Sequence, residues 1–144
     1  MHLKIILRNF IFLFLVLSVN SMDAPNELAE KNAKSHFFQK VQGAASVFAG
    51  GALICDPIES AQFIAAEALF LSMINLSHFN DADLENEETK KKAMSHLLSA
   101  ALNATAAYSI LYGAAEYYFA CDPKYIYFGS MLLIGAGVNT ILYS

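Results

Sequence analysis

The chain has 144 residues, of which 56% are hydrophobic and 15% are charged, and its formal net charge is -4. Soluble domains typically carry about 45–50% apolar and about 25% charged residues, so the excess apolar surface must enter a core, a bilayer or a partner. The acidic balance and the lack of a basic stripe exclude a nucleic-acid partner, because phosphate binding depends on clustered Lys and Arg. The length fits one domain.

The N-terminus has the pattern of a secretory signal peptide. Lys4 and Arg8 form a basic segment, residues 10–19 form an apolar one, and Ser21 offers a small residue before a cleavage site. The apolar run is short for a membrane-spanning helix. We therefore predict a signal peptide over 1–21 and a polar N-terminal arm over 22–34, with an uncleaved membrane anchor as the alternative.

Apolar residues at steps of three and four then predict a four-helix hydrophobic domain over 35–144. An acidic and basic hinge at 78–92 divides this domain into two hairpins, 35–77 and 93–144. Each hairpin contains one Cys-Asp-Pro triplet between two apolar segments, which suggests an internal repeat. The expected fold is all-α: a four-helix up-down bundle made of two similar hairpins, with both triplets at one end and the hinge at the other.

The Asp-Pro part of each triplet predicts the start of a helix. Asp56 and Asp122 are expected as N-caps, because a short carboxylate accepts hydrogen bonds from the first free N–H groups. Pro57 and Pro123 are expected as first helical residues, where a missing N–H has no consequence.

The expected oxidation state of the cysteine in each triplet depends on the cellular compartment of the protein. Cys55 and Cys121 are the only two cysteines. In an exported chain they are candidates for a disulfide bond between the two turns, whereas in the cytosol they would be ordinary thiols.

Two long segments lack any charge. The segment 125–143 has 19 uncharged residues, which span about 28 Å at 1.5 Å per residue and can cross a bilayer. The segment 97–115 is also uncharged and carries a stripe of small residues at steps of four. The stripe consists of Ala101, Thr105, Ser109 and Gly113. Such stripes are typical contact surfaces of membrane helices, so we expect a membrane protein; a tightly packed soluble bundle is the alternative.

The lysine distribution and the signal peptide predict opposite orientations in the membrane. Most lysines lie at the hinge end, which the positive-inside rule places in the cytoplasm. A signal peptide instead sends residue 22 outside, and four spans would then put the hinge outside as well. Either fewer helices span, or the whole mature chain is exported.

Glu67 and Glu116 lie within apolar segments and are candidate buried acids. A buried pair of acids could bind an ion or share a proton, but their depths differ by at least about one helical turn. The ordinary alternative is that each faces water or bonds to a neighbouring Tyr or Asn.

No motif predicts catalysis or a cofactor. His36 and His96 hold matching places in the two halves, but two histidines without further ligands make a poor metal site. The acidic run at 81–85 lacks the later glycine and glutamate of a calcium loop. With no nucleophile elbow, phosphate loop or HExxH motif in the sequence, we predict that the protein is not an enzyme and has no metal or cofactor.

We therefore expect a small exported, membrane-associated helical protein that serves as a structural or scaffolding subunit of an envelope or secretion assembly. Its expected partners are membrane lipid and other protein subunits, including copies of itself, and its expected place is the membrane or cell envelope. The alternative is a secreted, soluble, disulfide-stapled bundle that binds a partner or an apolar ligand.

Overall fold

The computed structural model describes residues 28–55, 57–58, 60–82, 84–120 and 122–143. This part of the chain forms four helices: α2 (Leu28–Cys55), α3 (Ala61–Asn80), α4 (Glu87–Ala120) and α5 (Lys124–Tyr143). The expected all-α class with four helices is confirmed. The predicted signal peptide and the first part of the predicted arm lie outside the described residues.

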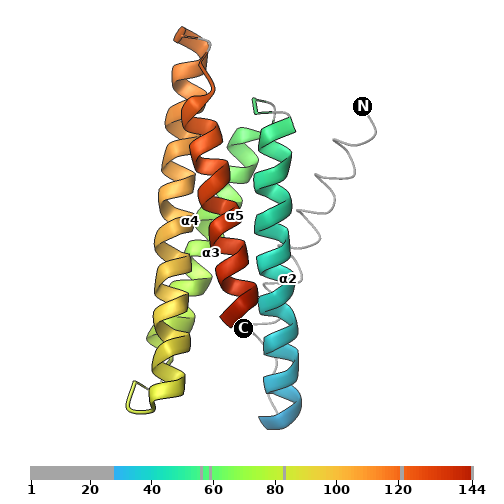
Figure 1. The fold of residues 1–144 in the computed structure, drawn as a ribbon, viewed down its shortest axis with the longest axis vertical. Helices are drawn as coiled ribbons and strands as arrows, with labels where there is room; N and C mark the ends of the chain where they lie inside the picture. Colours follow the sequence, from blue (N-terminus) through green and yellow to red (C-terminus); the bar gives the residue numbers. More distant parts are fainter. Residues whose placement is uncertain (1–27, 56, 59, 83, 121, 144) are drawn as a thin grey trace.

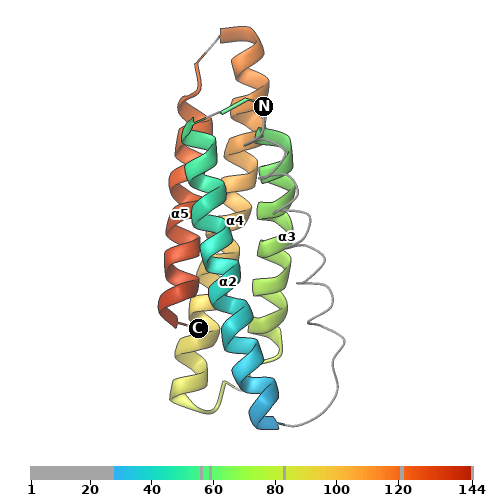
Figure 2. The same ribbon diagram turned by 90° about the vertical axis from the view of Figure 1, so that its right-hand side faces the viewer.

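The helices lie along one long axis, and successive helices run in opposite directions (Figure 1). The α2–α3 and α4–α5 connections lie at one end of the molecule, called here the upper end (Figures 1 and 2). The α3–α4 connection lies at the other, lower end. α4 rises above the rest of the molecule at the upper end.

The order of neighbours in space differs from the order along the chain. α5 packs closely against both α2 and α4, and α4 also packs against α3. In contrast, the backbones of α2 and α3 approach each other at few positions, and the two helices meet through larger side chains such as Val41 and Leu71. The helices of the predicted hairpin 35–77 are therefore held mainly by α5 and α4 rather than by each other.

The lower connection is shorter than the sequence suggested. α3 continues to Asn80 and α4 begins at Glu87, whereas the hinge was expected to cover 78–92. Asn86 explains the early start of α4, because its Oδ1 accepts a hydrogen bond from the Glu88 N–H at 2.9 Å and its carbonyl accepts one from the Lys90 N–H at 2.8 Å. An asparagine followed by two glutamates is a strong N-terminal signal, since acidic side chains favour the first turn.

The second Cys-Asp-Pro triplet starts a helix nearly as expected. The Asp122 side chain accepts a hydrogen bond from the Lys124 N–H at 3.0 Å. The Pro123 carbonyl accepts the first helical bond, from Tyr127, at 3.0 Å. Pro123 thus lies one residue before α5 rather than in its first position, and Asp122 satisfies an N–H of the first turn.

The first triplet does not start a helix. Pro57 lies in a turn, and the first helical bond of α3 runs from the Ile64 N–H to the Ser60 carbonyl at 3.0 Å. The expectation that Pro57 is the first helical residue is therefore wrong, and Asp56 lies outside the described residues. The physical reason is that the backbones of α2 and α3 are close at few positions, so a longer connection separates the two helices.

The contact between α2 and α5 depends on glycine. A Cβ atom added to Gly43 would lie 2.6 Å from the Gly137 carbonyl oxygen, and one added to Gly50 would lie 2.8 Å from the Ser130 carbonyl oxygen. The Ser130 hydroxyl donates a hydrogen bond to the Gly50 carbonyl at 2.5 Å, across the same contact. The two backbones therefore touch directly.

α5 makes a similar close contact with α4 on another of its faces. A Cβ atom on Gly129 would lie 2.9 Å from the Ala106 carbonyl oxygen. Towards the lower end the contact becomes polar, because the Asn139 amide donates to the Ser95 carbonyl at 3.0 Å and to the Ser99 hydroxyl at 2.8 Å. α5 is thus fixed on two sides by small and hydrogen-bonding residues.

The interior is rich in small side chains, although larger ones such as Leu53, Ile64 and Leu133 are fully buried among them. Of the seventeen buried hydrophobic residues in the described part of the chain, ten are alanine. Every described Phe, Tyr and Met side chain is at least partly exposed. Each helix has a large, mostly exposed apolar side chain in its apolar segment: Phe48 (68% exposed), Phe63 (60%), Tyr108 (71%) and Met131 (69%). Apolar side chains of this size and number are unusual on the surface of a water-soluble monomer.

We predict that Gly137→Ala lowers the free energy of unfolding by about 1–3 kcal/mol, because the added methyl group must push α2 away from α5. Gly135→Ala is the matched control, since a Cβ atom at Gly135 meets nothing within 4 Å. That change should stabilise the helix by up to about 1 kcal/mol. Thermal and chemical unfolding in detergent, followed by circular dichroism, measures the free energy of unfolding of both variants. Equal changes in the two variants would contradict the close contact at Gly137.

Candidate functional site

Glu67 is buried in the middle of the bundle, with only 3% of its surface exposed. Its Oε2 atom has no hydrogen-bond partner, and neither does the buried Oδ1 atom of Asn103 on α4. The Ser72 hydroxyl donates to the Ala100 carbonyl at 2.8 Å, so Glu67 is level with about residue 105 of α4, roughly 3 Å along the axis from Asn103. Two acceptor oxygens without donors thus lie at one level of the core, where an unpaired charge is costly.

Glu116, the other predicted buried acid, lies elsewhere. It is half-buried near the upper end of α4, and its Oε1 atom accepts a hydrogen bond from the Tyr112 hydroxyl at 3.1 Å. The helix register puts it about 16 Å above Glu67 along the axis. The structure does not bring the two acids together, so they do not form a shared ion or proton site.

The predicted small-residue stripe on α4 is divided between two environments. Ser109 and Gly113 are buried, and a Cβ atom on Gly113 would lie 2.7 Å from the Ile126 backbone nitrogen of α5. Ala101 and Thr105 are exposed. A step of four residues turns about 40° past a full helical turn, so three steps rotate the stripe by about 120° and carry it off the contact face.

A histidine pair lies at the lower end of the bundle. The rings of His78 and His96 have centroids 5.1 Å apart, and His96 Nδ1 lies 3.0 Å from Asn75 Oδ1. The Asn75 amide nitrogen donates to the Leu71 carbonyl at 2.9 Å, so its oxygen is the acceptor and His96 Nδ1 carries the proton. His36, expected to match His96, is exposed on α2 instead.

Burial sets the protonation of this pair. Desolvation, together with the neighbouring His78, lowers the pKa of His96 from 6.5 to about 4. Desolvation also lowers the pKa of His78, with partial compensation from Asp81. Both rings are therefore neutral at pH 7. Among the described residues no group of three or more His, Cys, Asp or Glu side chains could hold a metal ion.

The cysteines are only partly described. Cys55 is an exposed, free thiol at the upper end of α2. Cys121 lies outside the described residues, so the proposed disulfide remains a prediction.

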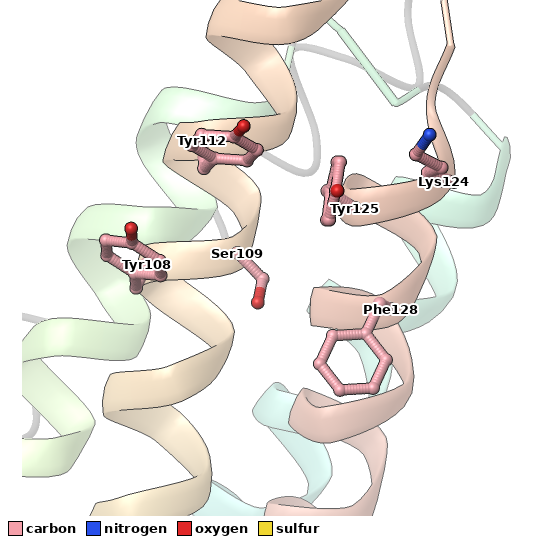
Figure 3. A pocket seen from close by; sticks show the side chains of 6 residues that line it. All are labelled: Tyr108, Ser109, Tyr112, Lys124, Tyr125 and Phe128. Carbon is pink, nitrogen blue, oxygen red and sulfur yellow. The ribbon is translucent and has the colours of Figure 1, made fainter.

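An aromatic groove lies between α4 and α5 at the upper end of the bundle (Figure 3). Its volume is about 520 Å³. It is lined by Tyr108, Ser109, Tyr112, Lys124, Tyr125 and Phe128. The apolar periodicity of the sequence did not predict this groove, because its two walls come from different helices.

The tyrosines of the aromatic groove contact one another. The rings of Tyr112 and Tyr125 meet edge to face with centroids 4.9 Å apart, and the Tyr108 and Tyr112 rings are stacked at 6.3 Å. The ammonium of Lys124 lies 5.2 Å from the centroid of the Tyr125 ring, a cation–π distance. The groove therefore already holds one cation against an aromatic face.

Charged groups surround the mouth of the aromatic groove. Lys124 forms an ion pair with Asp122 at 3.0 Å, which holds the pKa of Asp122 below its usual value. The hydrogen bond and charge of Asp122 raise the pKa of Lys124, and the charge of Glu116 adds a smaller contribution in the same direction. Lys124 contributes +1 and the two acids contribute -1 each, giving the mouth a formal charge of -1 at neutral pH.

Comparison with known proteins gives no matching family model, no matching curated protein and no matching solved structure.

We predict that Glu67→Gln changes the free energy of unfolding by less than about 1 kcal/mol, because the amide keeps the shape of the side chain without burying a charge. Glu67→Lys should cost about 3 kcal/mol or more, since it buries an unpaired ammonium. Glu88→Lys is the control on the exposed surface and should stay within about 0.5 kcal/mol. Urea unfolding in detergent measures all three. Equal damage by Gln and Lys would show that a charged, paired carboxylate is required.

We also predict a loss of stability on acidification. A histidine whose pKa is lowered in the fold takes up its proton more readily when unfolded, so its contribution is complete above pH 6.5 and is lost as the pH falls towards about 4. The loss should be about 1–2 kcal/mol once partial exposure is allowed for. Melting curves at pH 7.5 and pH 5 measure it. The difference in melting temperature between the two pH values should shrink in His96→Gln and persist in His36→Gln. The reverse result would show that His96 is not the group responsible for the loss of stability.

Proposed function

We propose that the protein is a small exported, membrane-embedded helical protein and a structural or scaffolding subunit of an envelope or secretion assembly. In this proposal a signal peptide precedes an up-down bundle made of two similar hairpins. The segments without charge, apart from Glu67, are 41–54 of α2, 61–77 of α3, 97–115 of α4 and 125–143 of α5. Of these, the segments of α4 and α5 are the proposed bilayer spans, which keeps the number of spans below four. Membrane lipid contacts the bundle and other protein subunits contact its ends.

The observation that carries the proposal is an uncharged band around the bundle. The four segments contain one charged residue, Glu67, and its side chain points into the core. At the upper edge of the band lie Asp122 and Lys124, and at the lower edge lie Lys40 and the lysines of 90–92. The 19 uncharged residues of α5 give the band a height of about 28 Å, close to the hydrocarbon thickness of a bilayer.

Helix length and composition support the same conclusion more weakly. Among the described helices, α4 and α5 are long and apolar enough to cross a membrane. A core helix of a soluble protein can pass this test, but such a helix is mostly buried. In the most apolar windows of α4 and α5 only 44% and 39% of the residues are buried, so more than half face outwards.

The upper end supports a subunit role. α4 continues above the start of α5, beyond the uncharged band (Figure 1). Tyr118 and Phe119 are largely exposed there. Large apolar side chains outside the bilayer are favourable when a protein partner covers them. This projecting turn is therefore the proposed contact with another subunit.

We expect the full chain to remain in the membrane fraction after carbonate extraction and to be released by detergent, because the uncharged band requires an apolar surrounding. Western blotting of the fractions measures this. A freely soluble monomer after carbonate treatment would reject the membrane proposal and favour the secreted bundle. Labelling of Cys55 with an impermeant maleimide in intact cells, with and without reductant, reports its compartment and any disulfide.

The subunit role has its own test. A photo-crosslinking residue at Phe119 should give a crosslinked product with a protein, whereas the same residue at Met131, within the uncharged band, should not. Crosslinks at neither position would reject the proposed contact while leaving the membrane proposal intact.

A further inference from the structure

The aromatic groove of Figure 3 has two chemical zones. Tyr108 and Phe128 form exposed apolar walls lower in the groove, within the uncharged band. Lys124, Tyr112 and Tyr125 lie at its upper mouth, at the edge of that band. A ligand that fits both zones has a polar head and an apolar tail.

The charges at the mouth select the kind of head. The ammonium of Lys124 has three donors, and its ion pair with Asp122 is exposed on both sides, with 62% and 45% of the side chains accessible. A phosphate oxygen can therefore reach the same ammonium. The two acids leave the mouth with a formal charge of -1, so a headgroup that is itself anionic would be repelled unless it also carries a positive charge.

The aromatic rings supply a place for that positive charge. Tyr112 and Tyr125 lie at the mouth with the edge of one ring against the face of the other, and the Tyr112 hydroxyl donates to Glu116, which holds a carboxylate beside Tyr112. Aromatic faces next to a carboxylate attract alkylammonium groups through cation–π and Coulomb interactions. One end of the mouth thus suits a phosphate and the other an ammonium.

We propose that the aromatic groove binds the headgroup of a zwitterionic phospholipid, with the phosphate at Lys124, the ammonium at Tyr112 and Glu116, and an acyl chain along Tyr108 and Phe128. The lipid as source rests on the proposed membrane location, since Lys124, Tyr112 and Tyr125 at the mouth of the groove lie at the upper edge of the uncharged band, where headgroups of the surrounding bilayer would lie.

The test measures lipid retained by the detergent-purified full chain by native mass spectrometry, with phosphatidylcholine, phosphatidylethanolamine and phosphatidylglycerol added separately. The zwitterionic lipids should bind at least about tenfold more tightly than phosphatidylglycerol, the size expected for one lost charge-assisted contact. Equal or stronger retention of phosphatidylglycerol would overturn the proposal. Phosphocholine without acyl chains should bind weakly; binding as tight as that of the lipid would overturn the lipid as the ligand.

Matched variants assign the contacts. Lys124→Gln should lower zwitterionic lipid retention about tenfold, whereas Lys92→Gln at the other end of α4 should not. Tyr112→Leu removes the ring and should weaken retention, while Tyr112→Phe keeps the ring and should retain most of it. Unchanged retention in Lys124→Gln and Tyr112→Leu, with wild-type melting temperatures, overturns the site. A change of oligomeric state in place of lipid loss would also overturn it, because a second copy would then occupy the groove.

Carbonate extraction of the same variants separates this inference from the membrane proposal. A protein that stays in the membrane but shows no lipid selectivity overturns the lipid site alone. A protein that is extracted as a soluble monomer overturns the membrane location, whatever its lipid binding in detergent.

Discussion

The close approach of α5 to two other helices is the constraint on which the rest of the structure depends. Gly137 lies against Gly43 on one face of α5, and Gly129 lies against Ala106 on another. Because backbones touch at these contacts, no larger side chain fits there without moving a helix. α5 is therefore the shared neighbour of α2 and α4, and α3 is held mainly by α4, with fewer contacts to α2.

Close backbones leave little interior volume, which explains the composition of the core. Alanine, glycine and serine fill the contacts, and the polar atoms among them bond across helices, as Ser130 does to Gly50 and Asn139 does to Ser99. The aromatic and many of the large aliphatic side chains then lie outside, where they form the uncharged band, while others such as Leu53 and Ile110 are buried. In water such a surface would associate with other apolar surfaces, whereas in a bilayer it matches its surroundings. The same packing that closes the interior thus creates the surface on which the proposed membrane location rests.

The two ends of the bundle have different chemistry. The upper end combines tyrosines, an ion pair and the projecting turn of α4, which suits contact with headgroups and with another subunit. The lower end has lysines outside and a neutral histidine pair inside, with His96 held by Asn75. Glu67 lies between the ends, and the helix register separates it from Glu116 at the upper end.

The sequence by itself determined the helical class, the approximate extent of four helices and the uncharged segments, because apolar periodicity and helix-stop signals are local. It also indicated a turn at Asp122, whose side chain accepts a hydrogen bond from the Lys124 N–H, although Pro123 and not Asp122 accepts the first helical bond. It did not reveal that α3 begins at Ala61 rather than Pro57, because the length of that connection depends on how far apart α2 and α3 lie.

Only the tertiary structure decided which small residues are contacts: Ser109 and Gly113 meet α5 while Ala101 and Thr105 of the same stripe face outwards. It also decided that Glu67 and Glu116 stay apart and that Tyr112 and Tyr125 share a groove, because the register between helices is set by packing across the bundle and not by spacing along one chain.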